Sequence, residues 1–168
     1  MEKNWLKKIP QEKGWYLAGF VDGEGSFNVS FTKKSDYCSG WQVTPSFNVS
    51  QRDGTILFLL KKYLECGRIK KRRDGLWIFV VENPRSLKEK VIPFFRKYQF
   101  FSSKAKTNFS IFCQIVKLID EDKHLTREGL EEIARLREKL NEGRKRKRKY
   151  NLSDIKASRN PQRLYAKL

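Results

Sequence analysis

Residues 15–27 read WYLAGFVDGEGSF and combine three glycines and two carboxylates with the apolar pattern of a short helix. Each glycine in a helix interior costs about 1 kcal/mol relative to alanine, so Gly19, Gly23 and Gly25 oppose the helix that their apolar neighbours favour. Small residues four apart form a stripe that lets two helix backbones approach closely. We therefore expect the stripe of Gly19 and Gly23 to meet a second helix.

Glu24 falls at the expected C-terminal end of this helix, where the helix macrodipole disfavours an anion. A carboxylate in that position favours a nearby cation, and a metal ion is the obvious candidate. The alternative is a solvated acid at a helix end, followed by an ordinary glycine cap.

The composition predicts a polyanionic partner. The chain has 168 residues, with 37 lysines and arginines against 19 acids and a net charge of +18, and this length suits one domain plus a tail. Nucleic acid is favoured over a membrane, because no stretch approaches the roughly 20 apolar residues of a spanning helix and no signal-peptide pattern is present. A solvated basic surface is the alternative.

The three cysteines, Cys38, Cys66 and Cys113, are far apart and lack C-x-x-C spacing. We expect neither a disulfide framework nor a zinc site. The expected location is a reducing intracellular compartment, either a bacterial cytoplasm or an organelle such as a mitochondrion or chloroplast.

The hydrophobic pattern predicts an α+β fold. Polar and apolar residues alternate over residues 26–34 and 41–50, which is typical of half-buried strands, and Pro45 favours an edge or bulge position. A helix from Thr55 to Leu64 and a second hairpin, 68–72 with 76–81, follow. The remaining helices are expected near 86–98, 104–120 and 126–142. Two hairpins can form one four-stranded antiparallel sheet with helices covering a single face.

The uncovered face of this sheet would carry hydroxyls, amides and cations, which suit base edges and phosphates. Trp77 and Phe79 have the same parity along their strand, which can place both on this face. A core position is the alternative. The predicted DNA contacts are Ser26, Asn28, Ser30, Thr32, Lys34, Gln42, Thr44, Ser46, Asn48, Arg68, Lys70, Arg72 and Trp77.

The stretch LAGFVDGEG, Leu17 to Gly25, resembles the motif of LAGLIDADG homing endonucleases. The order of elements from Trp15 to about Ile119 is similar to their repeating αββαββα core. The resemblance implies a saddle-shaped four-stranded sheet in a single endonuclease domain, residues 1–143. Residues 144–168, with the basic run Arg144 to Lys149, are expected to form a C-terminal extension: a flexible phosphate-binding segment, or else a nuclear-localisation signal.

The motif occurs once, so resemblance to the single-motif branch implies a homodimer with two identical half-sites. Helical geometry directs Asp22 away from Glu24, which suggests a capping or interface role for Asp22. The predicted dimer interface comprises Leu17, Ala18, Gly19, Asp22 and Gly23.

The resemblance implies that Glu24 is the catalytic acid, where many family members have aspartate. Two Glu24 carboxylates, helped by the Gly23 carbonyl, would hold Mg²⁺, and Mn²⁺ or Ca²⁺ is expected to substitute for binding. Gln51 and Lys104 would line the active site, with Lys106 as the second choice and phosphate anchoring as the alternative role of both lysines. The only histidine, His124, is expected at the surface.

The implied activity is double-strand cleavage of DNA at a long pseudo-palindromic site, leaving 3′ overhangs, with no small-molecule substrate and no membrane partner. Two other functions remain open on the same scaffold. One is an RNA-binding group I intron maturase. The other is a DNA-binding regulator derived from a degenerate copy, which would be expected to have lost the acid at position 24.

Overall fold

A four-stranded antiparallel sheet with the order β1-β2-β4-β3 forms the centre of the computed structural model, which describes residues 4–37, 39–142 and 148–158. The strands are β1 (Gly25–Lys33), β2 (Trp41–Gln51), β3 (Arg68–Lys71) and β4 (Trp77–Val81). The predicted four-stranded sheet is confirmed. Pro45 lies where β2 pairs with β1 alone, because β4 pairs only with residues 47–51 of β2. Its missing N–H therefore interrupts no second ladder.

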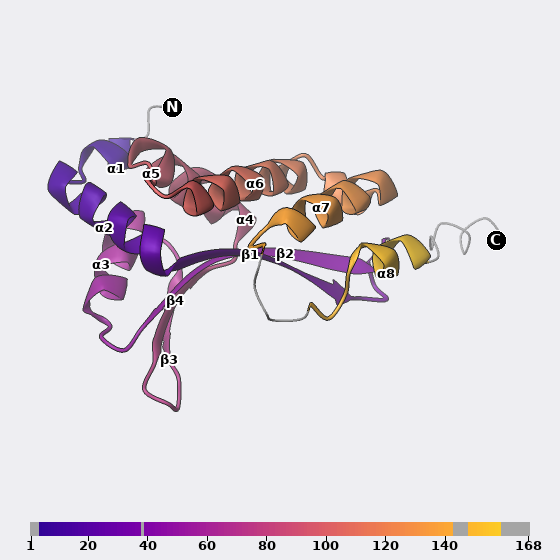
Figure 1. Cartoon of the computed structure of the whole chain (residues 1–168), viewed down its shortest axis with the longest axis horizontal. Helices are drawn as coiled ribbons and strands as arrows, with labels where there is room; N and C mark the ends of the chain where they lie inside the picture. Colours follow the sequence, from indigo (N-terminus) through magenta and orange to yellow (C-terminus); the bar gives the residue numbers. More distant parts are fainter. Residues whose placement is uncertain (1–3, 38, 143–147, 159–168) are drawn as a thin grey trace.

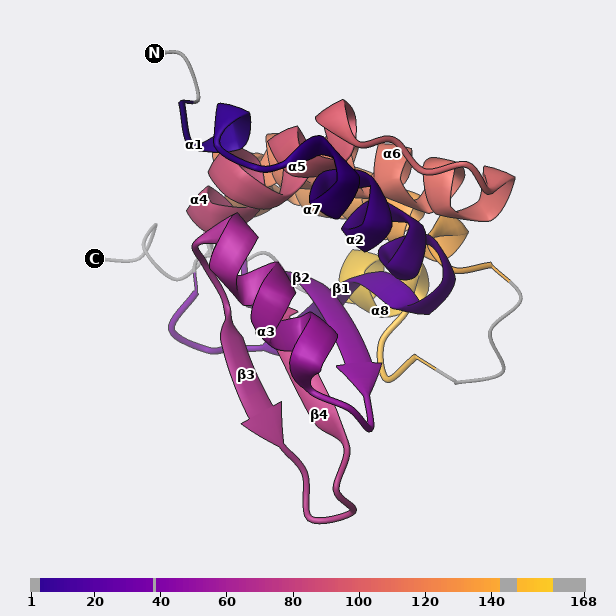
Figure 2. The same cartoon turned by 90° about the vertical axis from the view of Figure 1, so that its left-hand side faces the viewer.

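The helices cover one face of the sheet. Figure 1 shows α2, α5, α6 and α7 on one side of the strands, and Figure 2 shows α3 beside β3 and β4. The helices are α1 (Asn4–Lys7), α2 (Gln11–Glu24), α3 (Thr55–Leu64), α4 (Pro84–Ser86), α5 (Ile92–Lys97), α6 (Ser103–Asp120), α7 (Arg127–Lys139) and α8 (Leu152–Ala157), with a π-helical turn at Leu87–Val91 and a 3-10 turn at Lys123–Leu125. These helices do not cover the opposite face of the sheet (Figure 1).

The core is rich in aromatic side chains. Phe27, which is 4% exposed, lies at its centre, with ring centroids 5.2 Å from Phe47 and 4.9 Å from Phe112. Each aromatic residue removes a large apolar area from water. This packing joins β1 and β2 to α6.

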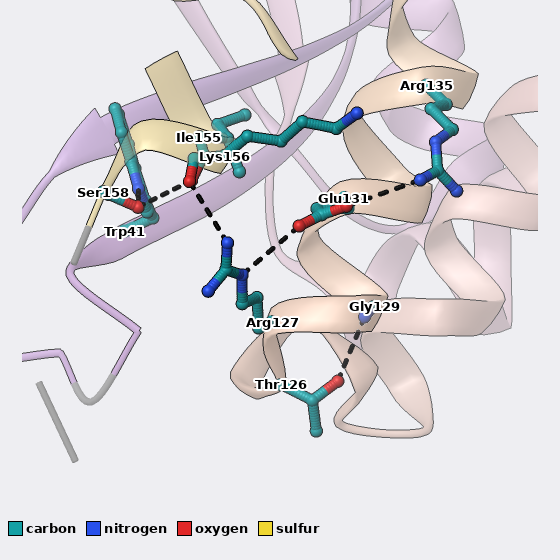
Figure 3. Close-up of polar contacts among 9 residues, drawn as sticks. All are labelled: Trp41, Thr126, Arg127, Gly129, Glu131, Arg135, Ile155, Lys156 and Ser158. Carbon is teal, nitrogen blue, oxygen red and sulfur yellow. Dashed lines mark hydrogen bonds and ion pairs between the residues drawn. The ribbon is translucent and has the colours of Figure 1, made fainter. Parts of the chain in front are cut away.

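The C-terminal segment is more ordered than its composition predicts. Ile155 of α8 is 3% exposed, and the ring of Tyr150 lies 4.9 Å from that of Trp41. Trp41 Nε1 donates a 2.9 Å hydrogen bond to Ser158 Oγ, and Arg127 Nη2 donates to the Lys156 carbonyl (Figure 3). The expectation of a flexible extension is therefore wrong for residues 148–158. Residues 144–147 of the basic run lie outside the described residues.

Two of the three cysteines are described, and both are free thiols. Burial raises the pKa of Cys66 and that of Cys113 to about 11, so both remain protonated at neutral pH. Cys38 lies outside the described residues. Within the described ranges, we find no helix with the length and apolar character needed to cross a membrane.

Candidate nucleic-acid interface

Helix α2 has one buried and one open face. Its buried residues are Gly14, Leu17, Ala18 and Val21. Gly19 and Gly23 are exposed, and a Cβ placed on either would meet no atom within 4 Å. The predicted glycine stripe is therefore available to a second helix.

The predicted interface is wrong for two of its members. Leu17 and Ala18 are both 0% exposed inside this chain's own core. With 3.6 residues per turn, positions 14, 17, 18 and 21 share one face, and positions 19 and 23 lie on the other. The large side chains on the open side are instead Trp15 and Tyr16, which are 43% and 55% exposed.

Asp22 caps the start of α6 in the same chain. Its Oδ2 accepts hydrogen bonds from the backbone N–H groups of Phe101, at 2.7 Å, and Ser102, at 2.9 Å, and the Ser102 hydroxyl donates to Oδ1. Partial burial acts to raise the pKa of Asp22, but these hydrogen bonds and the charge of Lys106 outweigh it, and the pKa is lowered. Of the two predicted roles, the structure supports capping.

Glu24 is the last residue of α2 and is exposed. Strand β1 begins at the next residue, and the Gly25↔Val49 pair brings the start of β1 beside the end of β2. Gln51 closes β2 at that same end of the hairpin. Glu24 and Gln51, far apart in sequence, are thus carried to one end of the sheet.

Among the residues that the structure describes, no group of three or more histidine, cysteine, aspartate or glutamate side chains could hold a metal ion. Glu24 is one carboxylate at a helix end whose last carbonyls, including that of Gly23, lack intrahelical donors. Oxygen donors of this kind suit Mg²⁺, which keeps several waters and takes few protein ligands. Glu24 offers one carboxylate for such an ion.

Lys104 and Lys106 lie in the first turns of α6, and both are exposed. Ser102 is the N-cap of this helix and accepts a 3.2 Å hydrogen bond from the Ala105 N–H. Because Asp22 binds the same Ser102, the helix that carries both lysines is tied directly to α2.

The predicted polar face exists as one surface. The pairs Ser26↔Asn48, Asn28↔Ser46, Ser30↔Thr44 and Thr32↔Gln42 place these side chains opposite the buried Phe27, Val29 and Phe31. Part of the face lines a groove of about 1120 Å³. The groove contains Glu24, Ser26, Asn28, Ser30, Ser46, Asn48 and Ser50, and is bordered beside β1 by Arg137, Glu138, Asn141, Arg148 and Lys149 among others. Lys34 lies outside β1, in the hairpin loop, and is exposed.

Three basic residues of the second hairpin are predicted to contact DNA, and only two of them lie within β3. Arg68 and Lys70 belong to β3 and are exposed on the polar side of the sheet, and Arg68 forms an ion pair with Glu82. Arg72 lies beyond the end of β3 and pairs with Asp74 at 3.0 Å.

The expectation that Trp77 shares the polar face is wrong. Trp77 pairs with Gln51, has the same parity as buried Phe79, and packs its ring 5.6 Å from that of Phe58 on α3. The alternation of β4 allowed either face, and packing against α3 decides for the helix-covered one. Gln51 shares this parity as well.

Sequence reasoning missed Asn141. Its Nδ2 donates a 2.7 Å hydrogen bond to the Phe27 carbonyl, and its backbone N–H donates to Asn108 Oδ1 at 2.9 Å. Asn141 therefore hydrogen-bonds to β1, an edge strand of the sheet, beside the groove. No sequence signal marks it, because its left-handed backbone (φ 56°) and its partners arise only in the fold.

Comparisons with known proteins agree with this geometry. A family model described as LAGLIDADG endonuclease matches residues 17–116. "DNA endonuclease I-CvuI" of Chlorella vulgaris is 35% identical over 144 residues, covering 81% of this chain and 84% of that protein. "Probable intron-encoded endonuclease 2" of Neurospora crassa is 39% identical over 132 residues, covering 76% of this chain but only 29% of that protein.

Solved structures show the same fold. The archaeal intron-encoded homing endonuclease I-Vdi141I complexed with DNA matches with a TM-score of 0.78 and 32% identity, covering 86% of this chain and 92% of that one. The I-SmaMI LAGLIDADG homing endonuclease bound to cleaved DNA has a TM-score of 0.74 and 32% identity, covering 82% of this chain and 45% of that one. This chain thus spans most of some relatives and less than half of others. With the family model matching more than half of its length, the chain belongs to the LAGLIDADG endonuclease family.

Proposed function

We propose that this chain is a site-specific endonuclease that cuts double-stranded DNA as a homodimer. One observation carries the proposal: the open face of α2, with Gly19 and Gly23, ends on exposed Glu24 where the polar sheet face begins. Pairing two such helices would bring two Glu24 carboxylates together beside two polar sheets. The printed descriptions of I-Vdi141I and I-SmaMI as DNA complexes support DNA as the partner.

The dimensions of the sheet suit a long site. Strand β1 has nine residues, and at about 3.3 Å per residue it spans roughly 30 Å. This length corresponds to about nine base pairs at 3.4 Å per step. Two subunits would cover close to two helical turns, and two-fold symmetry would make the site pseudo-palindromic.

Glu24 from each subunit would hold Mg²⁺, with the Gly23 carbonyl as a further oxygen donor. When bound, divalent metal supplies a nucleophile from water and stabilises negative charge on the scissile phosphate and the leaving oxygen. Gln51, at the same end of the β1–β2 hairpin, would orient water by hydrogen bonding. Lys104, with Lys106 as the second candidate, would neutralise phosphate charge.

The sheets would lie in the major groove, which leaves the dimer axis and both Glu24 residues over the minor groove between the half-sites. Cuts on opposite strands that face one minor groove leave 3′ overhangs. This end structure would be read directly from the cleaved product.

A plasmid that carries the uninterrupted insertion site of the gene tests the proposal. We expect a double-strand cut with Mg²⁺ and none with chelator. Glu24→Gln should abolish the cut, whereas Glu132→Gln, on the exposed side of α7, should cut like the unaltered chain. Specific binding to intron RNA without any metal-dependent DNA cut would favour the maturase instead, and binding of DNA without cutting would favour the regulator.

A further inference from the structure

Strand β4 carries two apolar side chains on the polar side of the sheet. Phe79 and Val81 are 0% and 2% exposed in the core. Ile78 and Val80 alternate with them, so they lie on the opposite face, and both are half-buried. Intrinsic strand propensity does not require this choice, because threonine is also a good strand former.

The strand register surrounds these two residues with groups suited to DNA. Val80 pairs with Asn48 of β2 on one side and Arg68 of β3 on the other. Ile78 likewise lies between Ser50 and Lys70. The three paired residues form a row across the sheet. In each row, β2 provides a hydrogen-bonding side chain, β4 an apolar one and β3 a cation.

The width of these rows matches a DNA groove. Neighbouring strands are about 4.8 Å apart, so each row spans about 10 Å, close to the roughly 12 Å width of the major groove. Cations at one end would reach phosphates at the groove edge, and the central apolar side chains would face base edges. The apolar feature of the major groove is the thymine 5-methyl group.

We propose that Ile78 and Val80 are specificity-determining residues that contact thymine methyl groups in the major groove. The inference rests on the proposed binding of DNA at the sheet face, and it names the chemistry that this strand selects. Residues two apart on a strand are about 6.6 Å apart, which is close to two steps of 3.4 Å. The two methyl groups should therefore belong to positions separated by one intervening base pair.

Replacement of thymine by uracil tests the contact, because it removes only the methyl group. The full chain, in Ca²⁺, would first select its site from a randomised duplex library. Each thymine of that site would then be replaced in turn and the Kd measured. In each half-site, we expect about a fourfold weaker Kd for each buried methyl group that is lost, at two positions separated by one base pair.

Matched variants assign each position to a residue. Val80→Ser and Ile78→Ser each remove every side-chain methyl group that could contact a thymine methyl. In each half-site, each variant should lose uracil sensitivity at one position and retain it at the other. Leu125→Ser changes an exposed apolar residue (49% exposed) outside the sheet and should retain all of these sensitivities.

Two failures are distinguishable. If the chain binds and cuts its site but shows no uracil-sensitive position, or if both serine variants keep the full sensitivity, the inference is overturned and the endonuclease proposal stands. If the chain selects no duplex at all, both are overturned.

Discussion

The carboxylate of Asp22 accepts a 2.9 Å hydrogen bond from the backbone N–H of Ser102, eighty positions later in the chain. This contact joins the C-terminal part of α2 to the N-terminus of α6, where a negative charge also complements the helix macrodipole. The helix proposed to pair with a second copy and the helix that carries Lys104 are thereby held together. Asp22 thus lies away from the proposed cleavage centre but fixes the position of α6 relative to α2.

Asp22→Asn should lower the free energy of unfolding by about 1.5–3 kcal/mol, the range for hydrogen bonds to a charged group. The folded state lowers the pKa of Asp22 from its ordinary value of 3.8. Its contribution is therefore present above pH 3.8 and is lost as the pH falls through the folded pKa. Urea unfolding at several pH values should show the difference between the variant and the unaltered chain narrowing below about pH 3.8. Asp36→Asn, in the exposed hairpin loop, serves as the control, and an equal loss in both variants would contradict the assignment.

Gly19→Leu should separate the subunits while leaving the fold of each intact. Its side chain would enter open space in one chain but would block close approach of a second α2. Sedimentation velocity should give a monomer with an unchanged circular dichroism spectrum. Gly14→Ala is the opposite case, because its Cβ would lie 2.1 Å from Tyr98 Cζ. This variant should lose about 1–3 kcal/mol of stability but still dimerise if folded. A dimeric Gly19→Leu variant would refute pairing through α2.

Lys104→Ala and Lys106→Ala separate the two active-site candidates. If Lys104 neutralises charge at the scissile phosphate, its removal should slow single-turnover cleavage by about 100-fold or more, as for other removed transition-state donors. Lys106 helps to lower the pKa of Asp22, so Lys106→Ala should have a smaller effect on the rate. The reverse ranking would assign the role to Lys106.

Ile155→Ala tests whether the C-terminal segment belongs to the domain. Ile155 is 3% exposed, and truncating a buried isoleucine typically costs about 2–5 kcal/mol. Urea unfolding should show this loss in a single cooperative transition. Lys156→Ala, on the exposed side of the same helix, should unfold like the unaltered chain. An unchanged unfolding curve for Ile155→Ala would mean that α8 contributes nothing to stability.

Local patterns in the sequence determined much of this protein. The alternation of Phe27 with Asn28 specifies both a strand and its two faces, because successive side chains on a strand point in opposite directions. The same reasoning placed both hairpins and the polar surface. The open glycines at 19 and 23 also follow from spacing along a helix.

Only the tertiary structure decided which face each element turns toward the rest of the chain. Helical periodicity groups Leu17 with Ala18, but burial against this chain's own core, and not at a subunit interface, depends on what lies beside α2. The contact with α3 decides which face of the sheet Trp77 occupies. The burial of Ile155 decides that the C-terminal segment packs on the domain. The partner of Asp22 lies eighty residues away. Such contacts join segments distant in sequence, and their free energy arises only when folding brings those segments together, so no local pattern encodes them.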